Sequence, residues 1–218
     1  MRLLRSRWSA EGRHLCYDKT YEFSYDSICL QMCCRNFVML SNSVIWEKNE
    51  MKFMESMQKI IVIGCPGSGK STFSRALHNK LGLPLCHLDM LYWNPDRTTV
   101  EKSVFLERLS AVIEKDEWII DGNYNGSMEL RMAACDTVIF LDYPTNVCLD
   151  GIRERRGKAR SDMPWIETNE EDSEFIDFIK NYNDQSRPKV VDLLEKYSNK
   201  NIVVFKSREE SDEFLSRL

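Results

Sequence analysis

The most constraining feature of this sequence is a glycine-rich run that ends in a lysine and a serine. The run matches the pattern G-x-x-x-x-G-K-[ST] at every position, and with the residue after it consists of Gly64, Cys65, Pro66, Gly67, Ser68, Gly69, Lys70, Ser71 and Thr72. Glycines in such a loop let successive backbone N–H groups turn inward around an anion. The lysine adds a positive charge, and the serine hydroxyl can bind Mg²⁺. The sequence therefore predicts a phosphate-binding loop at residues 64–72, with ATP and Mg²⁺ as its ligands.

The residues around this loop supply the setting that such a loop requires. Residues 59–63 form an apolar run that is typical of a buried parallel strand. After the loop, Phe73, Leu77 and Leu81 recur at helical spacing, and Gly82 marks the end of that helix. Strand, loop and helix in this order favour a phosphate-binding loop over a glycine-rich turn with an incidental lysine.

Strand and helix patterns alternate over the rest of the chain. We expect Thr98 and Glu101 to form a capping box at the start of one helix. We expect Thr145 to cap a second helix, and Ser207 with Glu210 to cap the last. Apolar runs predict four further strands, at residues 85–89, 117–121, 136–142 and 201–205. Five apolar strands separated by helices predict an α/β fold, in which helices cover both faces of a parallel sheet.

The alternating pattern covers residues 57–218, which we expect to form one domain. Residues 1–56 mix charges and scattered aromatic side chains without a sustained period. They are either a poorly ordered N-terminal extension or the translation of a region upstream of the real start. Met51, Met54 and Met57 lie just before the first strand and favour the second of these interpretations.

The composition argues against several classes of function. The net charge of −4 argues against direct nucleic-acid binding, because phosphate backbones require a basic surface. No apolar run approaches the ~20 residues that span a bilayer, and the N-terminal region lacks the apolar run of a secretory signal. The eight cysteines include no C-x-x-C pair. We therefore interpret them as the reduced thiols of a cytoplasmic protein.

Two aspartates are expected at the carboxyl ends of predicted strands, the edge at which parallel sheets bind ligands. Asp121 is the candidate for the magnesium side, where it would hold the metal together with Ser71. Asp89 could orient the hydroxyl of a phosphoryl acceptor, with the aromatic residues 92–93 as walls of its pocket. The alternatives are an Asp121 that forms a turn and an Asp89 that caps a helix. His87 is interpreted as a hydrogen-bonded core histidine.

A dense basic cluster follows the fourth predicted strand and consists of Arg153, Arg155, Arg156, Lys158 and Arg160. Mobile arginines that close over a transferred phosphoryl group stabilise its charge and exclude water. The cluster therefore predicts a short lid at residues 153–165, in which Arg153, Arg156 and Arg160 act on the phosphoryl group. The alternative is a solvated helix face on which Glu154 pairs with Lys158.

Four runs of the sequence resemble one family. They read HLDMLYW at 87–93, WIIDGNY at 118–124, VIFLDYP at 138–144 and RERRGKARSDM at 153–163. In combination they resemble the adenylate-kinase-like P-loop kinases of the "DNA topology modulation protein" group, over about residues 57–218. The resemblance implies a three-layer fold like that of the nucleoside-monophosphate kinases, with five parallel strands in the order 2-3-1-4-5. It also implies ATP·Mg²⁺ as phosphoryl donor and a lid that carries arginines.

The same resemblance implies roles for individual residues. Asp121 would take the place of the aspartate in the D-G-F-P-R motif of adenylate kinases, and Lys206 would border the adenine. This chain departs from that motif, because Asn123 and Tyr124 replace its phenylalanine and proline. In addition, no arginine follows at the position that grips the AMP phosphate in adenylate kinases. The acceptor therefore need not be AMP.

These observations leave functions of different classes open. The first is an ATP-dependent phosphotransferase that acts on a nucleotide, a nucleoside or another small hydroxylated metabolite. The alternatives are an ATP-binding regulatory or DNA-associated protein that affects DNA topology with weak ATPase activity, and a plain ATPase. An acceptor pocket at Asp89 together with a lid favours transfer over hydrolysis, because closure keeps water out.

The domain boundary leads to a first testable expectation. A chain that begins at Met57 should keep the full thermal shift that ATP·Mg²⁺ produces in the whole chain, because residues 1–56 have no core-forming pattern. The measurement is the melting temperature of both chains with and without ATP·Mg²⁺. A shortened chain that is insoluble or shows no shift would place residues 1–56 within the domain.

Overall fold

The computed structural model describes residues 37–38, 53, 56–158, 160–165 and 172–218. Most of the N-terminal segment therefore lies outside the described residues. The same holds for the first four cysteines. Within the described residues, no helix is both long enough and apolar enough to cross a membrane. The four cysteines that the structure describes are all free thiols.

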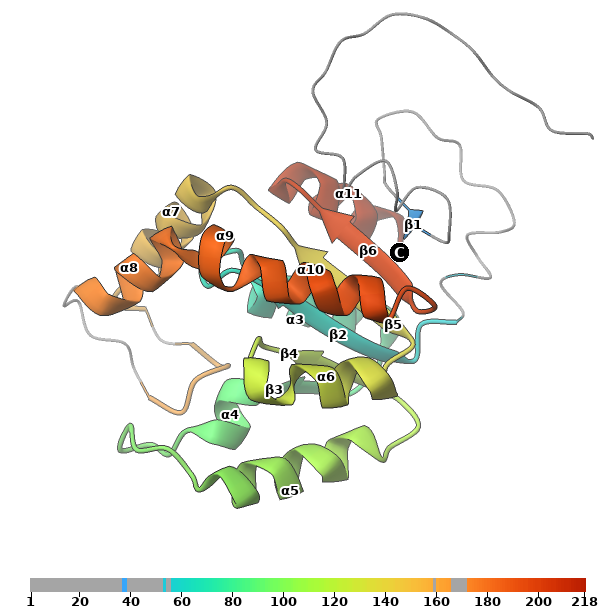
Figure 1. The fold of residues 1–218 in the computed structure, drawn as a ribbon, viewed down its shortest axis with the longest axis horizontal. Helices are drawn as coiled ribbons and strands as arrows, with labels where there is room; N and C mark the ends of the chain where they lie inside the picture. Colours follow the sequence, from blue (N-terminus) through green and yellow to red (C-terminus); the bar gives the residue numbers. More distant parts are fainter. Residues whose placement is uncertain (1–36, 39–52, 54–55, 159, 166–171) are drawn as a thin grey trace, which may run out of the picture.

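A parallel sheet forms the middle layer of the molecule (Figure 1). Its strands are β1 (Phe37–Val38), β2 (Lys59–Gly64), β3 (Leu85–His87), β4 (Trp118–Asp121), β5 (Thr137–Leu141) and β6 (Asn201–Phe205). All neighbouring strands pair in parallel, in the order β1-β6-β5-β2-β4-β3. The five strands from β2 onward thus follow the order 2-3-1-4-5, which confirms the predicted fold. The two-residue β1, which the sequence did not predict, extends the sheet beyond β6.

Helices cover both faces of this sheet. They are α3 (Lys70–Leu81), α4 (Leu88–Tyr92), α5 (Lys102–Ile113), α6 (Asn125–Ala134), α7 (Thr145–Arg155), α8 (Ser173–Lys180), α9 (Tyr182–Gln185), α10 (Arg187–Lys196) and α11 (Arg208–Arg217). One core cluster joins the sheet to α3, α7, α8, α9 and α11, and the other joins it to α4, α5, α6 and α10. In Figure 1, α6 and α10 accordingly pass in front of the sheet and α3 behind it.

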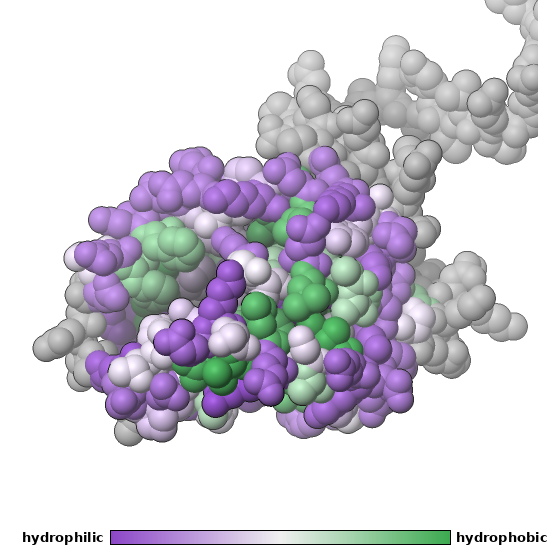
Figure 2. All heavy atoms as spheres, turned by 60° about the horizontal axis from the view of Figure 1, so that its bottom comes forward, coloured by the Kyte–Doolittle hydropathy of each residue, from purple (hydrophilic) through white to green (hydrophobic). Residues whose placement is uncertain are grey.

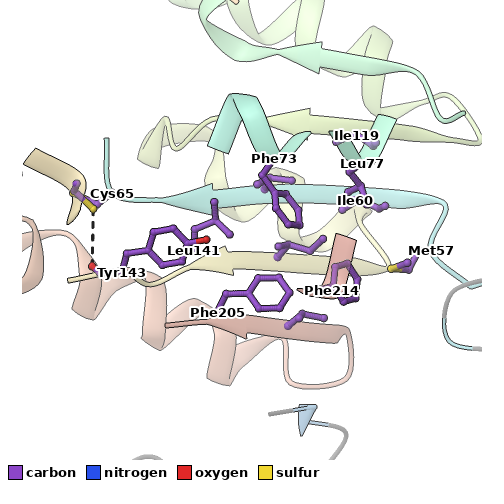
Figure 3. Close-up of a cluster of buried hydrophobic side chains, with 14 of the residues drawn as sticks. Met57, Ile60, Cys65, Phe73, Leu77, Ile119, Leu141, Tyr143, Phe205 and Phe214 are labelled. Atoms are coloured by element: carbon purple, nitrogen blue, oxygen red, sulfur yellow. Dashed lines mark hydrogen bonds between the residues drawn. The ribbon is translucent and has the colours of Figure 1, made fainter. Parts of the chain in front are cut away.

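The apolar run of β2 is explained by burial on both of its faces. Ile60 and Val62 point into the first cluster, whereas Ile61 and Ile63 point into the second, and all four are fully buried. In the first cluster the rings of three phenylalanines, Phe73, Phe205 and Phe214, pack with centroids 5.3–6.4 Å apart (Figure 3). Burial of one such side chain contributes ~1.5–3 kcal/mol, so these contacts stabilise the frame that carries the phosphate-binding loop.

Two of the predicted helix caps are wrong, and one is confirmed. Thr98 and Glu101 form no capping box, since α5 begins only at Lys102 and the Thr98 hydroxyl donates to Asp96 instead. Thr145 is the first residue of α7 rather than its cap. The expected cap at Ser207 is present, because its hydroxyl accepts a hydrogen bond from the backbone of the last helix.

The phosphate-binding loop packs directly against the backbone of α7. A Cβ atom on Gly67 would lie 2.0 Å from the carbonyl oxygen of Cys148, and a Cβ atom on Gly151 would lie 2.1 Å from the carbonyl oxygen of Gly67. Gly67 also has a positive φ of 84°, which favours glycine. The two glycines therefore allow the loop and the helix before the lid to meet without side chains between them.

This close contact predicts an unusual effect of a glycine-to-alanine change within a helix. Gly151→Ala should destabilise the protein by about 1–3 kcal/mol, because the added methyl group overlaps the Gly67 carbonyl. Gly126→Ala in α6 is the matched control, since a Cβ there meets nothing within 4 Å. The control should stabilise by about 0.5–1 kcal/mol. Urea unfolding measures both, and equal effects of the two substitutions would contradict the packing described here.

Candidate functional site

The phosphate-binding loop connects β2 to the first turn of α3. Gly69 lies directly before α3 with a φ of 91°, and a Cβ there would meet no neighbour within 4 Å. The Lys70 side chain folds back over the loop, where its ammonium group donates to the carbonyl oxygens of Gly64 at 2.9 Å and Cys65 at 3.0 Å. Burial lowers the pKa of Lys70. These contacts hold the lysine at the mouth of the loop, as binding of a phosphate requires.

Asp121 lies at the carboxyl end of β4 and is buried. One of its carboxylate oxygens accepts a hydrogen bond from Nδ1 of His87 at 2.7 Å, whereas the other oxygen is buried without a partner in the protein. His87 is hydrogen-bonded as expected, but its partner is Asp121, a candidate site residue. A buried carboxylate oxygen without a donor fits a hydrated Mg²⁺ at this edge of the sheet.

The described residues contain no group of three or more His, Cys, Asp or Glu that could hold a metal ion by itself. Ser71, at the start of α3, and Asp121 are therefore the two predicted metal-binding residues that the structure offers. Such a sparse set suits Mg²⁺, which in phosphate sites keeps several waters and takes further oxygens from the nucleotide. The donor set thus fits ATP·Mg²⁺.

The loop after β4 is tied to the phosphate-binding loop by Asn123. Its side-chain oxygen accepts from the Gly64 N–H at 3.0 Å, and its side-chain nitrogen donates to the Gly64 carbonyl at 2.6 Å. The last residue pair of the β2–β4 ladder is Val62 with Asp121, so the amide continues that ladder by one more step. The residue that departs from the adenylate-kinase motif therefore fixes the start of the phosphate-binding loop relative to Asp121.

A buried arginine holds the same loop from the other side. Arg131 of α6 donates to the carbonyl oxygens of Gly122 at 2.8 Å, Asn123, and Tyr124 at 3.3 Å. Burial lowers the pKa of Arg131 to about 10, so the guanidinium remains charged at neutral pH. Arg131 was not predicted from the sequence. Its signal was the position of a charged side chain on the buried face of α6, next to Met132.

Asp89 lies in the first turn of α4, because β3 ends at His87, two residues earlier than predicted. Its carboxylate accepts a hydrogen bond from the Tyr124 hydroxyl at 2.6 Å, and burial raises the pKa of Asp89. The Tyr124 ring packs against Tyr92 and Phe105 with centroids 4.9 and 5.3 Å apart. Tyr92, one of the two predicted aromatic residues, thus packs on the tyrosine that binds Asp89.

A cavity of about 470 Å³ adjoins this aromatic group. It is lined by Tyr92, Thr99, Val100, Glu101, Lys102, Phe105, Leu106, Tyr124, Asn125, Gly126 and Ser127. The view in Figure 2 turns the side of α5 forward and shows apolar patches between hydrophilic residues. The volume and the mixed lining are those of a small-molecule site, and no arginine is among the lining residues.

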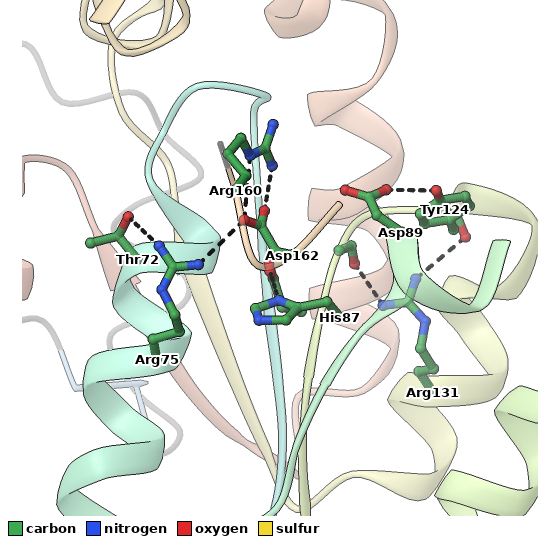
Figure 4. A network of polar contacts seen from close by, with 10 residues as sticks. Thr72, Arg75, His87, Asp89, Tyr124, Arg131, Arg160 and Asp162 are labelled. Atoms are coloured by element: carbon green, nitrogen blue, oxygen red, sulfur yellow. Dashed lines mark hydrogen bonds and ion pairs between the residues drawn. The ribbon is translucent and has the colours of Figure 1, made fainter. Parts of the chain in front are cut away.

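The predicted lid arginines differ in their surroundings. Arg153 pairs with Asp150 on its own helix at 2.8 Å, and both side chains are more than half exposed. Arg156 directly follows α7 and is half-buried. Arg160 binds the buried carboxylate of Asp162, which Arg75 of α3 also contacts (Figure 4). The structure therefore brings Arg160 to the helix of the phosphate-binding loop.

Lys206, the predicted neighbour of the adenine, lies directly after β6. Its ammonium group and the guanidinium of Arg187 both bind the carboxylate of Asp142, at the end of β5. Although burial raises the pKa of Asp142, these hydrogen bonds hold it below its usual value. The charge of Lys206 is thus already paired, and its backbone is the part that could border a base.

No protein-family model matches the chain, and no curated protein matches it in sequence. Among solved structures, the chain is similar to a shikimate kinase from Bacteroides thetaiotaomicron (23% identity, TM-score 0.44, 74% of this chain and 95% of that one). It is also similar to a shikimate kinase from Aquifex aeolicus (21% identity, TM-score 0.42, 72% of this chain and 92% of that one). A third similar structure is a shikimate kinase from Acinetobacter baumannii in complex with shikimate (14% identity, TM-score 0.42, 76% of this chain and 93% of that one). These likenesses carry no argument about the acceptor of this chain.

The loop geometry predicts how ATP should affect stability. ATP·Mg²⁺ at a hundredfold excess over Kd should stabilise the protein by about 2.7 kcal/mol, or roughly 5–10 °C in melting temperature. Lys70→Ala should lose most of this shift. Lys80→Ala, which removes an exposed lysine from the same helix, should keep it. Equal shifts for wild type and Lys70→Ala would contradict the assignment of the loop.

Proposed function

We propose that this protein is an ATP-dependent phosphotransferase that moves the γ-phosphoryl group of ATP·Mg²⁺ to a hydroxyl group of a small acceptor. The observation that carries the proposal is the hydrogen bond from Tyr124, which lines the cavity, to the carboxylate of Asp89. A hydrolase requires only a bound nucleotide and water. A half-buried carboxylate that is bound by a residue lining a separate cavity supports a second substrate.

On the nucleotide side, residues 64–72 would cradle the phosphates with backbone N–H groups, and Lys70 would contribute a positive charge. Ser71 and Asp121 would hold Mg²⁺. The metal, when bound, neutralises the charge that develops on the phosphate oxygens. His87 fixes the Asp121 carboxylate through one oxygen and leaves the other for the hydrated metal.

On the acceptor side, the proposed role of Asp89 is to accept the proton of the attacking hydroxyl. A carboxylate with a raised pKa is a stronger base than an exposed one, and burial has this effect on Asp89. The Tyr124 hydroxyl fixes the orientation of that carboxylate. The acceptor would be a nucleotide, a nucleoside or another small hydroxylated metabolite, and Lys102 is the cation in the cavity lining.

The lid would complete the site. Arg160 is the predicted lid arginine that the structure connects to the phosphate-binding loop, and it is our candidate for stabilising the transferred group. Trp165 of the lid packs edge-to-face on Trp93 with ring centroids 5.0 Å apart, next to the acceptor side. This contact would exclude water from the acceptor. We propose a cytoplasmic reaction with a small-molecule acceptor and no direct nucleic-acid partner.

Substitution of Asp89 separates transfer from hydrolysis. In a screen of nucleoside and metabolite pools, Asp89→Asn should lower acceptor-dependent ADP release about a hundredfold or more, because the amide cannot accept the proton. The slow background hydrolysis of ATP should remain. Asp116→Asn, which changes an exposed loop aspartate in the same way, should leave both rates unchanged.

Two results would contradict this proposal. If Asp89→Asn keeps the acceptor-dependent rate, the acceptor binds elsewhere. If no pool stimulates ADP release by the wild-type protein, the regulatory ATP-binding function or the plain ATPase replaces the phosphotransferase.

A further inference from the structure

We propose that Asp162 is a positioning residue that docks the lid on the helix of the phosphate-binding loop and orients both the Ser71 hydroxyl and the Arg160 guanidinium. No motif singled out this aspartate. The role of Arg160 in catalysis rests on the proposed phosphotransferase function. The docking of the lid and the effect on Ser71 do not rest on that function, because both can be tested by nucleotide binding alone.

The burial of Asp162 is the first argument. This residue is 2% exposed although it lies in a loop segment outside the helices and strands. Aspartates are almost never buried to this extent unless they are paired. Another ion pair at this end of α7, Arg153 with Asp150, has side chains that are 66% and 58% exposed. A pair so exposed is worth ~0–1 kcal/mol, whereas the loss of one partner of a buried pair is far more costly.

The partners of Asp162 come from two separate parts of the chain. Arg160 donates from Nε at 3.3 Å to one carboxylate oxygen and from Nη2 to the other, so its guanidinium is held at two points. Arg75 of α3 donates from Nη1 to the first oxygen at 3.3 Å, and its other terminal nitrogen contacts the Thr72 hydroxyl at 3.3 Å. Asp162 therefore joins the lid to the first turns of α3.

Ser71 is the third group that acts on Asp162, because its side chain contributes to the lowered pKa of the Asp162 carboxyl. Although burial raises the pKa of Asp162, the contacts from Arg160 and Ser71 hold it well below its usual range. A serine hydroxyl that donates its one proton to a carboxylate keeps its lone pairs for another partner. In the proposed site, Asp162 would thus leave the lone pairs of the Ser71 hydroxyl available to Mg²⁺.

Three residues further along the chain, the lid contacts the acceptor side. Trp165 packs edge-to-face on Trp93 at 5.0 Å, and Trp93 directly follows α4, the helix that carries Asp89. Residues 160–165 therefore contact the phosphate-binding helix at one end and the acceptor side at the other. Docking through Asp162 consequently sets where Trp165 can lie.

The test measures ADP binding by calorimetry with and without Mg²⁺, so it requires no acceptor and no turnover. Asp162→Asn should reduce the gain in affinity that Mg²⁺ gives to ADP by about 10- to 100-fold, the usual effect of losing a residue that orients a metal ligand. Asp177→Asn is the matched control. It breaks an exposed pair with Lys180 on α8 and should leave the gain unchanged.

A second readout follows the lid itself. The change in tryptophan fluorescence on addition of ADP and Mg²⁺ should be reduced in Asp162→Asn, with Trp165→Phe identifying the contribution of Trp165. Arg75→Gln keeps Asp162 but removes its ion pair with Arg75 of α3, and should reduce the fluorescence change in the same way. This variant decides the question if Asp162→Asn does not fold.

The proposal is overturned if a folded Asp162→Asn keeps both the Mg²⁺-dependent gain and the fluorescence change, or if Arg75→Gln in its place keeps the fluorescence change. The outcome is distinct from failure of the proposed function. A wild-type protein that binds ADP with Mg²⁺ but transfers no phosphoryl group would contradict the proposed phosphotransferase function. The docking role of Asp162 would still be decided by these two measurements.

Discussion

The candidate site depends on one short loop, residues 122–124, which is held from both sides. The Asn123 amide forms two hydrogen bonds with the backbone of Gly64, where the phosphate-binding loop begins. The buried guanidinium of Arg131 binds the carbonyl oxygens of the same loop. An unpaired buried carbonyl would cost about 1–3 kcal/mol, so the cation fixes the loop as well as satisfying it. Because Tyr124 in this loop binds Asp89, the nucleotide and acceptor sides keep one relative position.

The strand order could be predicted because its causes lie in short stretches of sequence. The apolar runs of β2, β5 and β6 follow from burial on both faces of a parallel sheet, and the glycine spacing of the phosphate-binding loop places a helix directly after β2. The boundaries were less accurate. Nothing in the sequence around Asp89 showed that β3 ends at His87 and that a five-residue helix follows.

The contacts that assemble the site could be predicted only in part. Asp121 and Asp89 were found because strand ends of a parallel sheet meet at one edge. Asn123 and Asp162 were missed because their partners lie 59 residues away in Gly64 and 87 residues away in Arg75. Such pairings depend on how loops pack after the sheet has formed. Local patterns of charge and hydropathy do not record that packing.

The central claim is that the bound phosphoryl group passes to an organic acceptor rather than to water. The most direct measurement uses ATP radiolabelled in its γ-phosphoryl group, incubated with Mg²⁺, the protein and a pool of small metabolites, followed by chromatography of the labelled products. The geometry of Asp89 and the adjoining cavity predicts label in a new organic phosphate. Label found only in inorganic phosphate, or only in unreacted ATP, would contradict this account.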